Sequence, residues 1–263
     1  MGLPFLFIMA TLMVMDMHIA VIILAAGLGT RMKSNKAKVL HEICGKPMIH
    51  YVAETAREIA GNNVVLVVGN QADKVRRTVL KIGPFSFAYQ KKQLGTGHAV
   101  RCALPYLPDR CCEVVILCGD VPLIKAETVS GLITSHRAEE RDISVLAVEV
   151  RNPTGYGRIL LDESGQVQAI VEESDATAEQ KRIRLINTGI FCVRKQFLLA
   201  AVPRIQSDNA KGEIYLTDIV EIAYSEKKRV GVTVGGNYFE VTGINTIQEL
   251  KKVEQAMKNP QRI

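Results

Sequence analysis

The sequence predicts an α/β protein with a doubly wound, mostly parallel sheet, and three observations support this fold class. Continuous apolar runs alternate with amphipathic segments in the first half, as in Val64–Val68 followed by Asp73–Leu80. Runs without polar alternation are typical of strands covered on both faces, as in parallel sheets. The length of 263 residues suits one large domain, or one domain with a small lobe. Ligands of such sheets bind at the carboxyl ends of strands.

The first half is predicted to contain four strands, each followed by a helix. Short Val/Ile/Leu-rich runs define the strands, and longer stretches with apolar residues at helical spacing define the helices. Pro47 suits the first turn of a helix, because its missing N–H has no partner there. The expected pairs are Ala20–Leu24 with Pro47–Ala60, Val64–Val68 with Asp73–Leu80, Phe85–Tyr89 with Gly97–Leu104, and Val114–Leu117 with Lys125–Ala138.

The second half is predicted to add a small β-rich lobe. Asp162-Glu-Ser-Gly165 favours a hairpin turn between two extended runs, and Gly235-Gly236 separates two expected edge strands. A charged amphipathic pattern then predicts a last helix that ends at Asn259-Pro260. The expected strands are Ile143–Val150, Tyr156–Leu161, Val167–Val171, Arg184–Val193, Val230–Val234 and Tyr238–Val241, and the expected helices are Lys195–Val202, Glu213–Glu226 and Ile247–Met257.

Charge and cysteine content narrow the function classes. A net charge of +6 favours anionic ligands, but the cations are spread out and the chain has no tryptophan, so nothing indicates nucleic-acid binding. The six cysteines form no Cys-x-x-Cys pair, and no histidine lies at metal-ligand spacing from them. We therefore expect free thiols, a cytoplasmic location and no structural zinc site.

The N-terminal stretch is predicted to lie outside the fold. Gly2–Met15 is almost wholly apolar, but it has no preceding Lys or Arg and no clear cleavage site, unlike a signal peptide. Asp16 and His18 interrupt it, so it is too short to span a bilayer. We expect residues 1–18 to be an extension, and Met15 and Met17 offer alternative starts. A peripheral membrane anchor is the other interpretation.

A glycine-containing basic loop is the most informative motif of the chain. The run Leu24-Ala-Ala-Gly-Leu-Gly-Thr-Arg-Met-Lys-Ser34 follows the first strand, and Lys36 and Lys38 come next. Glycines allow backbone N–H groups to approach a phosphate, and the cations neutralise it. The dinucleotide fingerprint fails because Met32 replaces its third glycine, and Gly45-Lys46-Pro47 does not fit a P-loop. The loop therefore fits neither of these two motifs, and a nucleotide triphosphate is the expected ligand; a plain strand–helix turn with a solvated basic face stays open.

Later motifs add a family resemblance. With the loop above, Lys38-Val-Leu-His41 resembles the signature of nucleotide-sugar pyrophosphorylases, and the order of the later motifs is similar to that in bacterial N-acetylglucosamine-1-phosphate uridyltransferases. The resemblance covers residues 19–250. The motifs are Gln90-Lys-Lys-Gln-Leu-Gly-Thr-Gly-His-Ala99, Gly119-Asp-Val-Pro-Leu123, Pro153-Thr-Gly-Tyr-Gly-Arg158, Ile170-Val-Glu172, Ile186-Asn-Thr-Gly189 and Gly243-Ile-Asn245.

The resemblance implies a Rossmann-like nucleotidyltransferase fold and a reaction. UTP and N-acetylglucosamine 1-phosphate would give UDP-N-acetylglucosamine, a precursor of peptidoglycan and lipopolysaccharide, and pyrophosphate. The attacking phosphate oxygen is already anionic, so the reaction needs fixed cations, N–H donors and a metal, but no general base. The resemblance implies Mg²⁺ as cofactor and these two small molecules as substrates; from the sequence itself we expect no nucleic-acid partner and no membrane contact.

Roles follow from the resemblance position by position. Arg31 and Lys38 match the catalytic cations, and Asp120 with Asn245 matches the magnesium ligands. An isolated Asp120 would otherwise be a turn residue, and Asn245 a helix cap. Three groups match substrate-binding positions: Leu24, Ala25, Ala26, Gly27 and Gly119 along the nucleotide, Gln90, Gly95 and Thr96 at uracil, and Gly157, Glu172 and Asn187 at the sugar. Glu173 is expected to be solvated, and His41 and His98 to be structural.

The chain departs from the family pattern at two positions. Ala37 replaces the usual proline and is expected to loosen the loop, and Cys118 replaces a residue whose backbone role it can retain. We divide the chain into residues 19–246 as the nucleotidyltransferase domain and 247–263 as a C-terminal helix that forms the stub of a linker. The bifunctional members continue into a trimer-forming β-helix, which is absent here, so we expect no acetyltransferase activity and leave the oligomeric state open. Alternatives are a pyrophosphorylase for another sugar or base, and a catalytically decayed nucleotide-sugar-binding regulator.

Overall fold

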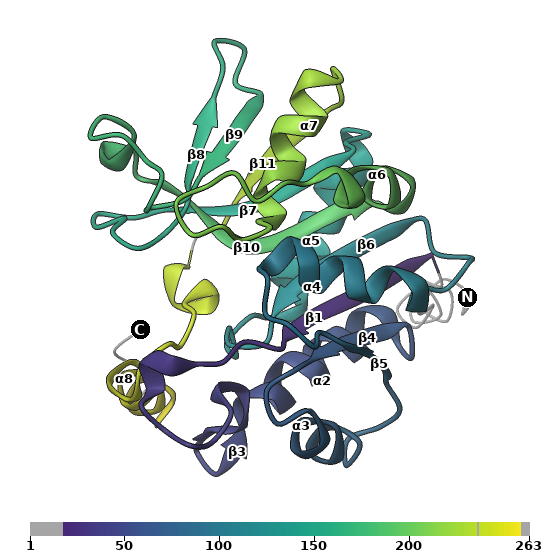
Figure 1. The fold of residues 1–263 in the computed structure, drawn as a ribbon, viewed down its shortest axis with the longest axis vertical. Coiled ribbons are helices and arrows are strands. Elements are labelled where there is room, and N and C mark those ends of the chain that lie inside the picture. The colour runs from purple at the N-terminus through teal and green to yellow at the C-terminus, as the bar shows by residue number, and fades with distance from the viewer. Residues whose placement is uncertain (1–17, 236, 259–263) are drawn as a thin grey trace, which may run out of the picture.

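A large mixed sheet forms the centre of the molecule (Figure 1). The computed structural model describes residues 18–235 and 237–258, and within them the nine-stranded sheet has the order β11-β7-β10-β6-β1-β4-β5, with β8 and β9 branching from β10. Strand β10 runs antiparallel to β6 and β7, and β1 pairs in parallel with β4 and β6. The predicted doubly wound, mostly parallel sheet is confirmed. The strands are β1 (Ile19–Ala25), β4 (Val64–Val68), β5 (Ser86–Tyr89), β6 (Glu113–Cys118), β7 (Ile143–Glu149), β8 (Arg158–Leu161), β9 (Val167–Val171), β10 (Leu185–Arg194) and β11 (Val230–Val234).

Helices cover both faces of this sheet, which explains why its central strands are apolar on both sides. Along β1, Val21 and Ile23 pack into one core with α2, α3 and α5. Ala20 and Ile22 pack into a second core with α4, α6 and α7. The helices are α2 (Met48–Ala60), α3 (Ala72–Val79), α4 (Thr96–Ala103), α5 (Ala126–Ala138), α6 (Lys195–Ala201), α7 (Ile219–Ser225) and α8 (Ile247–Lys258).

A third, smaller core lies beside the loop that follows β1. Leu250 and Val253 of α8 pack there with Met32, Ile43 and Met48. The last described helix is thus in direct contact with the predicted nucleotide loop, although it is more than 200 residues away in sequence. The division of the chain at residue 246 stays a prediction, and the predictions for residues 1–17 and 259–263 lie outside the described residues. No helix in the described part of the chain is long and apolar enough to cross a bilayer.

Three local predictions differ from the structure. Tyr238–Val241 was expected to be an edge strand but is a 3-10 helix, because the Asn237 side chain accepts a hydrogen bond from the Phe239 N–H and closes a local turn. The predicted helix Glu213–Glu226 begins as α7 only at Ile219, after a short 3-10 turn. A small hairpin, β2 (Glu42–Ile43) with β3 (Lys46–Pro47), was not predicted. Its turn needs two residues with positive φ, and the first is a cysteine, which gives little sequence signal.

Candidate active site

The loop after β1 brings two cations to the carboxyl end of the sheet. Gly29 has a φ of +65°, and a Cβ atom there would lie 2.7 Å from the Cβ of Lys38. Glycine is therefore required for the close approach of these two parts of the loop. Two short 3-10 turns, Thr30–Met32 and Lys38–Leu40, then carry Arg31 and Lys38. The buried side chains of Met32 and Leu40 anchor these turns.

Four polar side chains from three distant segments meet at this loop. The Nζ of Lys38 donates to Asn245 Oδ1 over 3.0 Å and forms an ion pair with Asp120. The Nη2 of Arg31 donates to the same Asn245 oxygen over 2.8 Å. Lys38 and Asp120 keep 17 % and 19 % of their side chains exposed, so a ligand can reach both. The structure thus brings together the four residues that the sequence assigns to phosphate and metal.

Backbone contacts hold the segments that carry these side chains. Asp120 follows β6, and its carbonyl accepts a hydrogen bond from Ile244 N over 2.8 Å. Gly119 N donates to the Leu24 carbonyl at the end of β1, and a Cβ on Gly119 would lie only 3.0 Å from that oxygen. The strand ends at Leu24 and Ala25 are thereby fixed next to Asp120. Ala25 is buried at the end of β1 and pairs with Val68.

Asn245 is not the cap of helix α8, which was the alternative explanation for it. Thr246 Oγ1 accepts from the Glu249 N–H, and Glu249 accepts from the N–H groups of Asn245 and Thr246. This reciprocal pattern is a capping box centred on Thr246. The amide oxygen of Asn245 therefore points to Lys38 and Arg31 and not to its own helix.

The residues that are predicted to recognise the base share one cavity with the cations. This cavity of about 360 Å³ is lined by Leu24, Ala26, Gly27, Arg31, Lys38, Gln90, Gly95, Thr96 and Asn245, among others. Gln90 is only 4 % exposed, and its Nε2 donates to the Gly95 carbonyl and lies 3.1 Å from His98 Nδ1. Gly95 has a φ of +109°, and a Cβ there would lie 2.4 Å from the Ile214 carbonyl oxygen. The Gln90 amide is thus held in one orientation by the following loop.

The three residues predicted to bind a sugar form a second group. Asn187 N donates to the Gly157 carbonyl over 2.9 Å, and a Cβ on Gly157 would lie 3.5 Å from the Glu172 carboxyl group. Burial raises the pKa of Glu172, and a nearby Lys211 opposes this effect. Glu172 lines a separate cavity of about 360 Å³ together with Asp175 and Tyr215, so this group does not share the lining of the nucleotide cavity.

Sequence reasoning missed two polar residues and misplaced a third. Glu213 lines the nucleotide cavity, and Thr217 lies within hydrogen-bonding distance of Glu172. Both stand in a segment that was interpreted as helix, and the polar run itself was the available signal. Glu173 was expected to be solvated, which is wrong. It accepts from buried Arg158 over 2.6 Å, and this hydrogen bond lowers the pKa of Glu173.

The donor chemistry of the site suits a hard cation. Within the described residues no three His, Cys, Asp or Glu side chains gather as a metal cluster. Asp120 and Asn245 nevertheless direct a carboxylate oxygen and an amide oxygen at one cationic group, the Lys38 ammonium. Mg²⁺ takes few protein oxygens and keeps water and phosphate ligands, so such a pair fits its coordination habits.

Comparisons with known proteins agree on one protein family. A model of the MobA-like NTP transferase domain matches residues 21–183. The bifunctional protein GlmU of Geotalea uraniireducens is 44 % identical over 241 residues, which are 92 % of this chain and 53 % of that protein. GlmU of Desulfotalea psychrophila is 38 % identical over 91 % of this chain and 70 % of its own length. The chain spans about half the length of several curated relatives that it matches.

A solved structure gives an independent measure of the fold. The structure of a UDP-glucose pyrophosphorylase complexed with UDP-glucose superposes with a TM-score of 0.72 and covers 92 % of this chain and 98 % of that one. The two sequences are 18 % identical, so this likeness shows the shared fold alone.

Proposed function

We propose that this chain, which belongs to the MobA-like NTP transferase family, transfers a uridylyl group from UTP to N-acetylglucosamine 1-phosphate. The products are UDP-N-acetylglucosamine and pyrophosphate. One observation carries the proposal. Lys38 contacts both Asp120 and Asn245 at the mouth of the cavity that Gln90, Gly95 and Thr96 line. The similarity to GlmU proteins over nine-tenths of the chain supports the choice of substrates.

The reaction is an in-line displacement at the α-phosphorus of UTP. An anionic oxygen of the sugar phosphate forms a bond to this phosphorus, and the bond to the β-phosphate oxygen breaks, so pyrophosphate leaves with the electron pair. No proton has to move, because the attacking oxygen is already ionised. Catalysis then consists of orienting two anions that repel each other and of neutralising the charge that develops. Arg31 and Lys38 are the proposed cations, and each is expected to lower the barrier by about 3–4 kcal/mol.

Members of this family generally use a divalent metal ion, and we assign Mg²⁺ to this chain. Asp120 and Asn245 are the proposed ligands, because they supply the hard oxygen pair described above. When bound, the ion neutralises phosphate charge. Lys38 holds both ligand side chains in one arrangement, since it contacts each of them. Arg31 restrains the Asn245 amide from the other side.

Substrate selection is assigned to two groups of residues, one at the nucleotide cavity and one beside the separate cavity that Glu172 lines. The Gln90 amide offers a donor and an acceptor to the uracil edge, and the loop through Gly95 fixes its orientation. Glu172 and Asn187 offer hydrogen bonds to the sugar hydroxyl groups and the N-acetyl group, and Gly157 leaves room for the ring. The product would feed peptidoglycan and lipopolysaccharide synthesis in the cytoplasm.

A pyrophosphate-release assay with a matrix of substrates tests the proposal. UTP and dTTP are each combined with N-acetylglucosamine 1-phosphate and glucose 1-phosphate. We expect the highest kcat/KM for UTP with N-acetylglucosamine 1-phosphate. A better rate with another pair would change the substrates but keep the chemistry. Release from no pair would indicate the nucleotide-sugar-binding regulator.

The metal assignment has its own test. Asp120→Ala should lose Mg²⁺-dependent pyrophosphate release while its far-UV circular dichroism stays unchanged. Full activity of this folded variant would refute the assignment of Asp120.

A further inference from the structure

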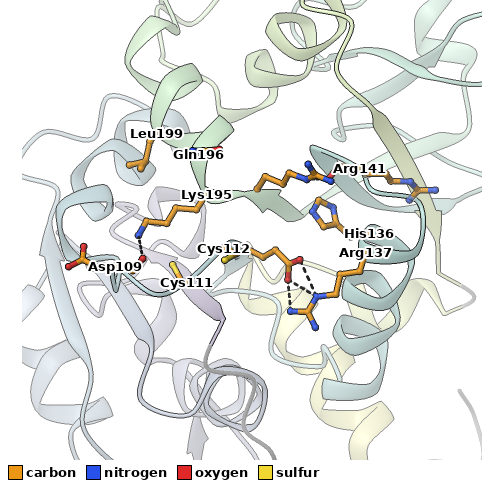
Figure 2. A pocket seen from close by; sticks show the side chains of 11 residues that line it. Asp109, Cys111, Cys112, His136, Arg137, Arg141, Lys195, Gln196 and Leu199 are labelled. Carbon is orange, nitrogen blue, oxygen red and sulfur yellow. Dashed lines mark hydrogen bonds and ion pairs between the residues drawn. The ribbon is translucent and has the colours of Figure 1, made fainter.

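A second cavity lies at the opposite end of strand β6 from Asp120 (Figure 2). Its volume is about 680 Å³, which lies in the range of small-molecule sites. The strand begins with Glu113 at this cavity and ends just before Gly119 and Asp120, so the cavity is separate from the candidate active site. The ends of α5 and β10 and the starts of β7 and α6 complete its walls.

Cations outnumber carboxylates in the wall of this cavity. Arg137, Arg141, Arg194 and Lys195 line it, against Asp109 and Glu113. At neutral pH this set carries a charge of +2, which matches a phosphate monoester dianion. In Figure 2 Lys195 and Cys111 lie on one side of the view, and Arg141 and His136 lie on the other.

Two of these cations are not neutralised by acidic side chains. Arg137 pairs with Glu113, and Arg141 pairs with Glu139. Lys195 Nζ instead donates to the Pro108 and Asp109 carbonyls, and Arg194 donates to the Arg141 and Glu140 carbonyls. Within residues 18–235 and 237–258 neither Arg194 nor Lys195 forms an ion pair with a carboxylate. Their positive charges are held in place by neutral acceptors, and an anion in the cavity would complement them.

A buried histidine in the wall supplies an unused hydrogen-bonding atom. His136 is 1 % exposed, and its Nδ1 lies 2.9 Å from Ser144 Oγ. Its Nε2 has no hydrogen-bond partner in the described part of the chain. Burial, helped by Arg194 and Arg141 and opposed by Glu113, lowers the pKa of His136 to about 4, so the ring is neutral and carries one N–H.

The neighbours of Ser144 decide which nitrogen carries that proton. Arg141, which can only donate, approaches the Ser144 oxygen at 3.5 Å. We assign the Ser144 hydroxyl proton to His136 Nδ1, the one acceptor given for it among the described residues, which places the ring proton on Nε2. A buried N–H without a partner is unusual in a native protein and indicates a missing acceptor.

From these observations we propose that the cavity lined by His136, Arg141, Arg194 and Lys195 binds a small organic phosphate monoester. The phosphate oxygens would meet the cations and the His136 N–H. Cys111 and the half-exposed Leu199 would contact the organic part. Nothing in this proposal depends on the reaction at the other end of the sheet.

The His136 ring provides a direct reporter. In a ¹H–¹³C NMR titration of the full chain, the His136 ring signal, assigned with His136→Gln, is followed while phenyl phosphate is added. We expect a saturable chemical-shift change in the millimolar range or below. Inorganic phosphate should cause a weaker saturable change, and benzyl alcohol none, because it lacks the anion. Saturation by benzyl alcohol, or no saturable change with phenyl phosphate, would overturn the proposal.

A matched pair of surface variants tests the location. Leu199→Glu places a negative charge at the rim without removing any internal hydrogen bond, and Leu161→Glu does the same at the end of β8, away from the cavity. Both leucines are exposed, at 40 % and 47 %. We expect Leu199→Glu to weaken the titration at least tenfold and Leu161→Glu to leave it within twofold. Equal affinities in both variants would refute the proposed site.

A third variant distinguishes binding at this cavity from binding at the active site. Lys38→Met should leave the His136 titration unchanged, because Lys38 lies at the other end of the sheet. If Lys38→Met abolished the titration, the signal would report the active site and the proposal would be wrong.

Discussion

The two ends of strand β6 use charged side chains in different ways. At the carboxyl end, Lys38 reaches Asp120 and Asn245 over 82 and 207 positions of sequence. At the amino end some partners are close in sequence: Arg141 pairs with Glu139 two residues away, and His136 meets Ser144 over eight, although Lys195 reaches Pro108 over 87. The contacts of Lys38 exist only in the assembled fold, whereas those of Arg141 with Glu139 and of His136 with Ser144 join elements that follow one another in the chain.

The exposed fraction of the charged and polar side chains also differs between the two ends of β6. Lys38 and Asp120 keep nearly a fifth of their side chains exposed, whereas His136 and Ser144 are almost fully buried. A partly exposed ion pair contributes little to stability, while a buried polar group that loses its partner costs its desolvation. Substitutions at the carboxyl end of β6 should therefore reduce activity, and substitutions at its amino end should reduce stability.

The largest expected effect tests the carboxyl end. Lys38→Met removes the ammonium shared by Asp120 and Asn245, and kcat/KM for pyrophosphate release should fall by about 10²–10³, or about 3–4 kcal/mol. The midpoint of thermal unfolding should change little. Lys74→Met, a change of the same type on exposed α3, serves as control and should keep activity within threefold. Wild-type kcat/KM in Lys38→Met would contradict the role of Lys38.

Asn245 sharpens the comparison because it sits beside a helix cap. Asn245→Ala removes the acceptor of two charge-assisted hydrogen bonds, so kcat/KM should fall by roughly 30–100-fold. Thr246→Ala should instead lower the free energy of unfolding by about 1 kcal/mol with little change in kcat/KM, since Thr246 caps α8. Steady-state kinetics and urea unfolding of both variants separate the two roles. The reverse pattern would show that Asn245 acts mainly in capping.

Ser144 tests the amino end of β6. Ser144→Ala removes the hydroxyl that meets both His136 and Arg141, and buried polar atoms then lose a partner. We expect the free energy of unfolding to fall by about 2 kcal/mol in urea denaturation. Ser130→Ala on the exposed face of α5 should stay within about 0.5 kcal/mol. If both serines gave equally small effects, the contrast between the two ends would not hold.

Asp218 extends the comparison to a third region, next to Glu172. Burial raises the pKa of Asp218 to about 7, and Glu221 and Glu172 add to this effect. A carboxyl group with a raised folded-state pKa contributes stability that is full below about pH 4 and is lost as pH rises through about 7. The Asp218→Asn variant has no carboxyl group at this position, so it does not lose this stability as the pH rises. The full shift would increase its free energy of unfolding relative to wild type by about 2.7 kcal/mol between pH 5 and pH 8.5, and solvent screening of the partly exposed side chain reduces the expected increase to about 1.5 kcal/mol. A pH-independent difference in urea unfolding would be inconsistent with this assignment.

The smallest expected effect concerns the nucleotide loop. Ala37 was expected to loosen the loop where the family has proline, but its backbone has φ −55° and ψ 138°, which proline adopts readily. Ala37→Pro should raise the free energy of unfolding by about 0.5 kcal/mol, because it restricts the unfolded chain. Thermal unfolding measures the change. Destabilisation by the proline would mean that the Ala37 N–H or the conformation of Lys36 matters to the loop.

Most elements could be predicted because their signals are local. The strand Val64–Val68 matches its predicted bounds, since a continuous run of five apolar residues permits few other structures. The prediction of a strand at Tyr238–Val241 was wrong because the Asn237 side chain closes a turn, and the segment forms a 3-10 helix. Glu173 failed because the sequence does not show that the guanidinium of Arg158 is buried beside it.

The candidate site also has a part that local motifs could predict and a part that they could not. The glycines, cations and oxygen donors could be chosen from motifs, but their assignment to catalysis, metal and substrate remains a prediction. Glu213 and Thr217 escaped prediction because they join the site through the 210–217 loop, which packs on Gly95 and Gly97.

The sequence by itself determined the fold class, the two apolar faces of the sheet and the residue types at its carboxyl edge, because periodicity and glycine spacing are local properties. Only the tertiary structure decided that Lys38, Asp120 and Asn245 share one point, and that four cations surround His136 at the other end. Such meetings depend on strand order and on which loops pack together. Those are set by the simultaneous burial of many apolar side chains and cannot be read from any one segment.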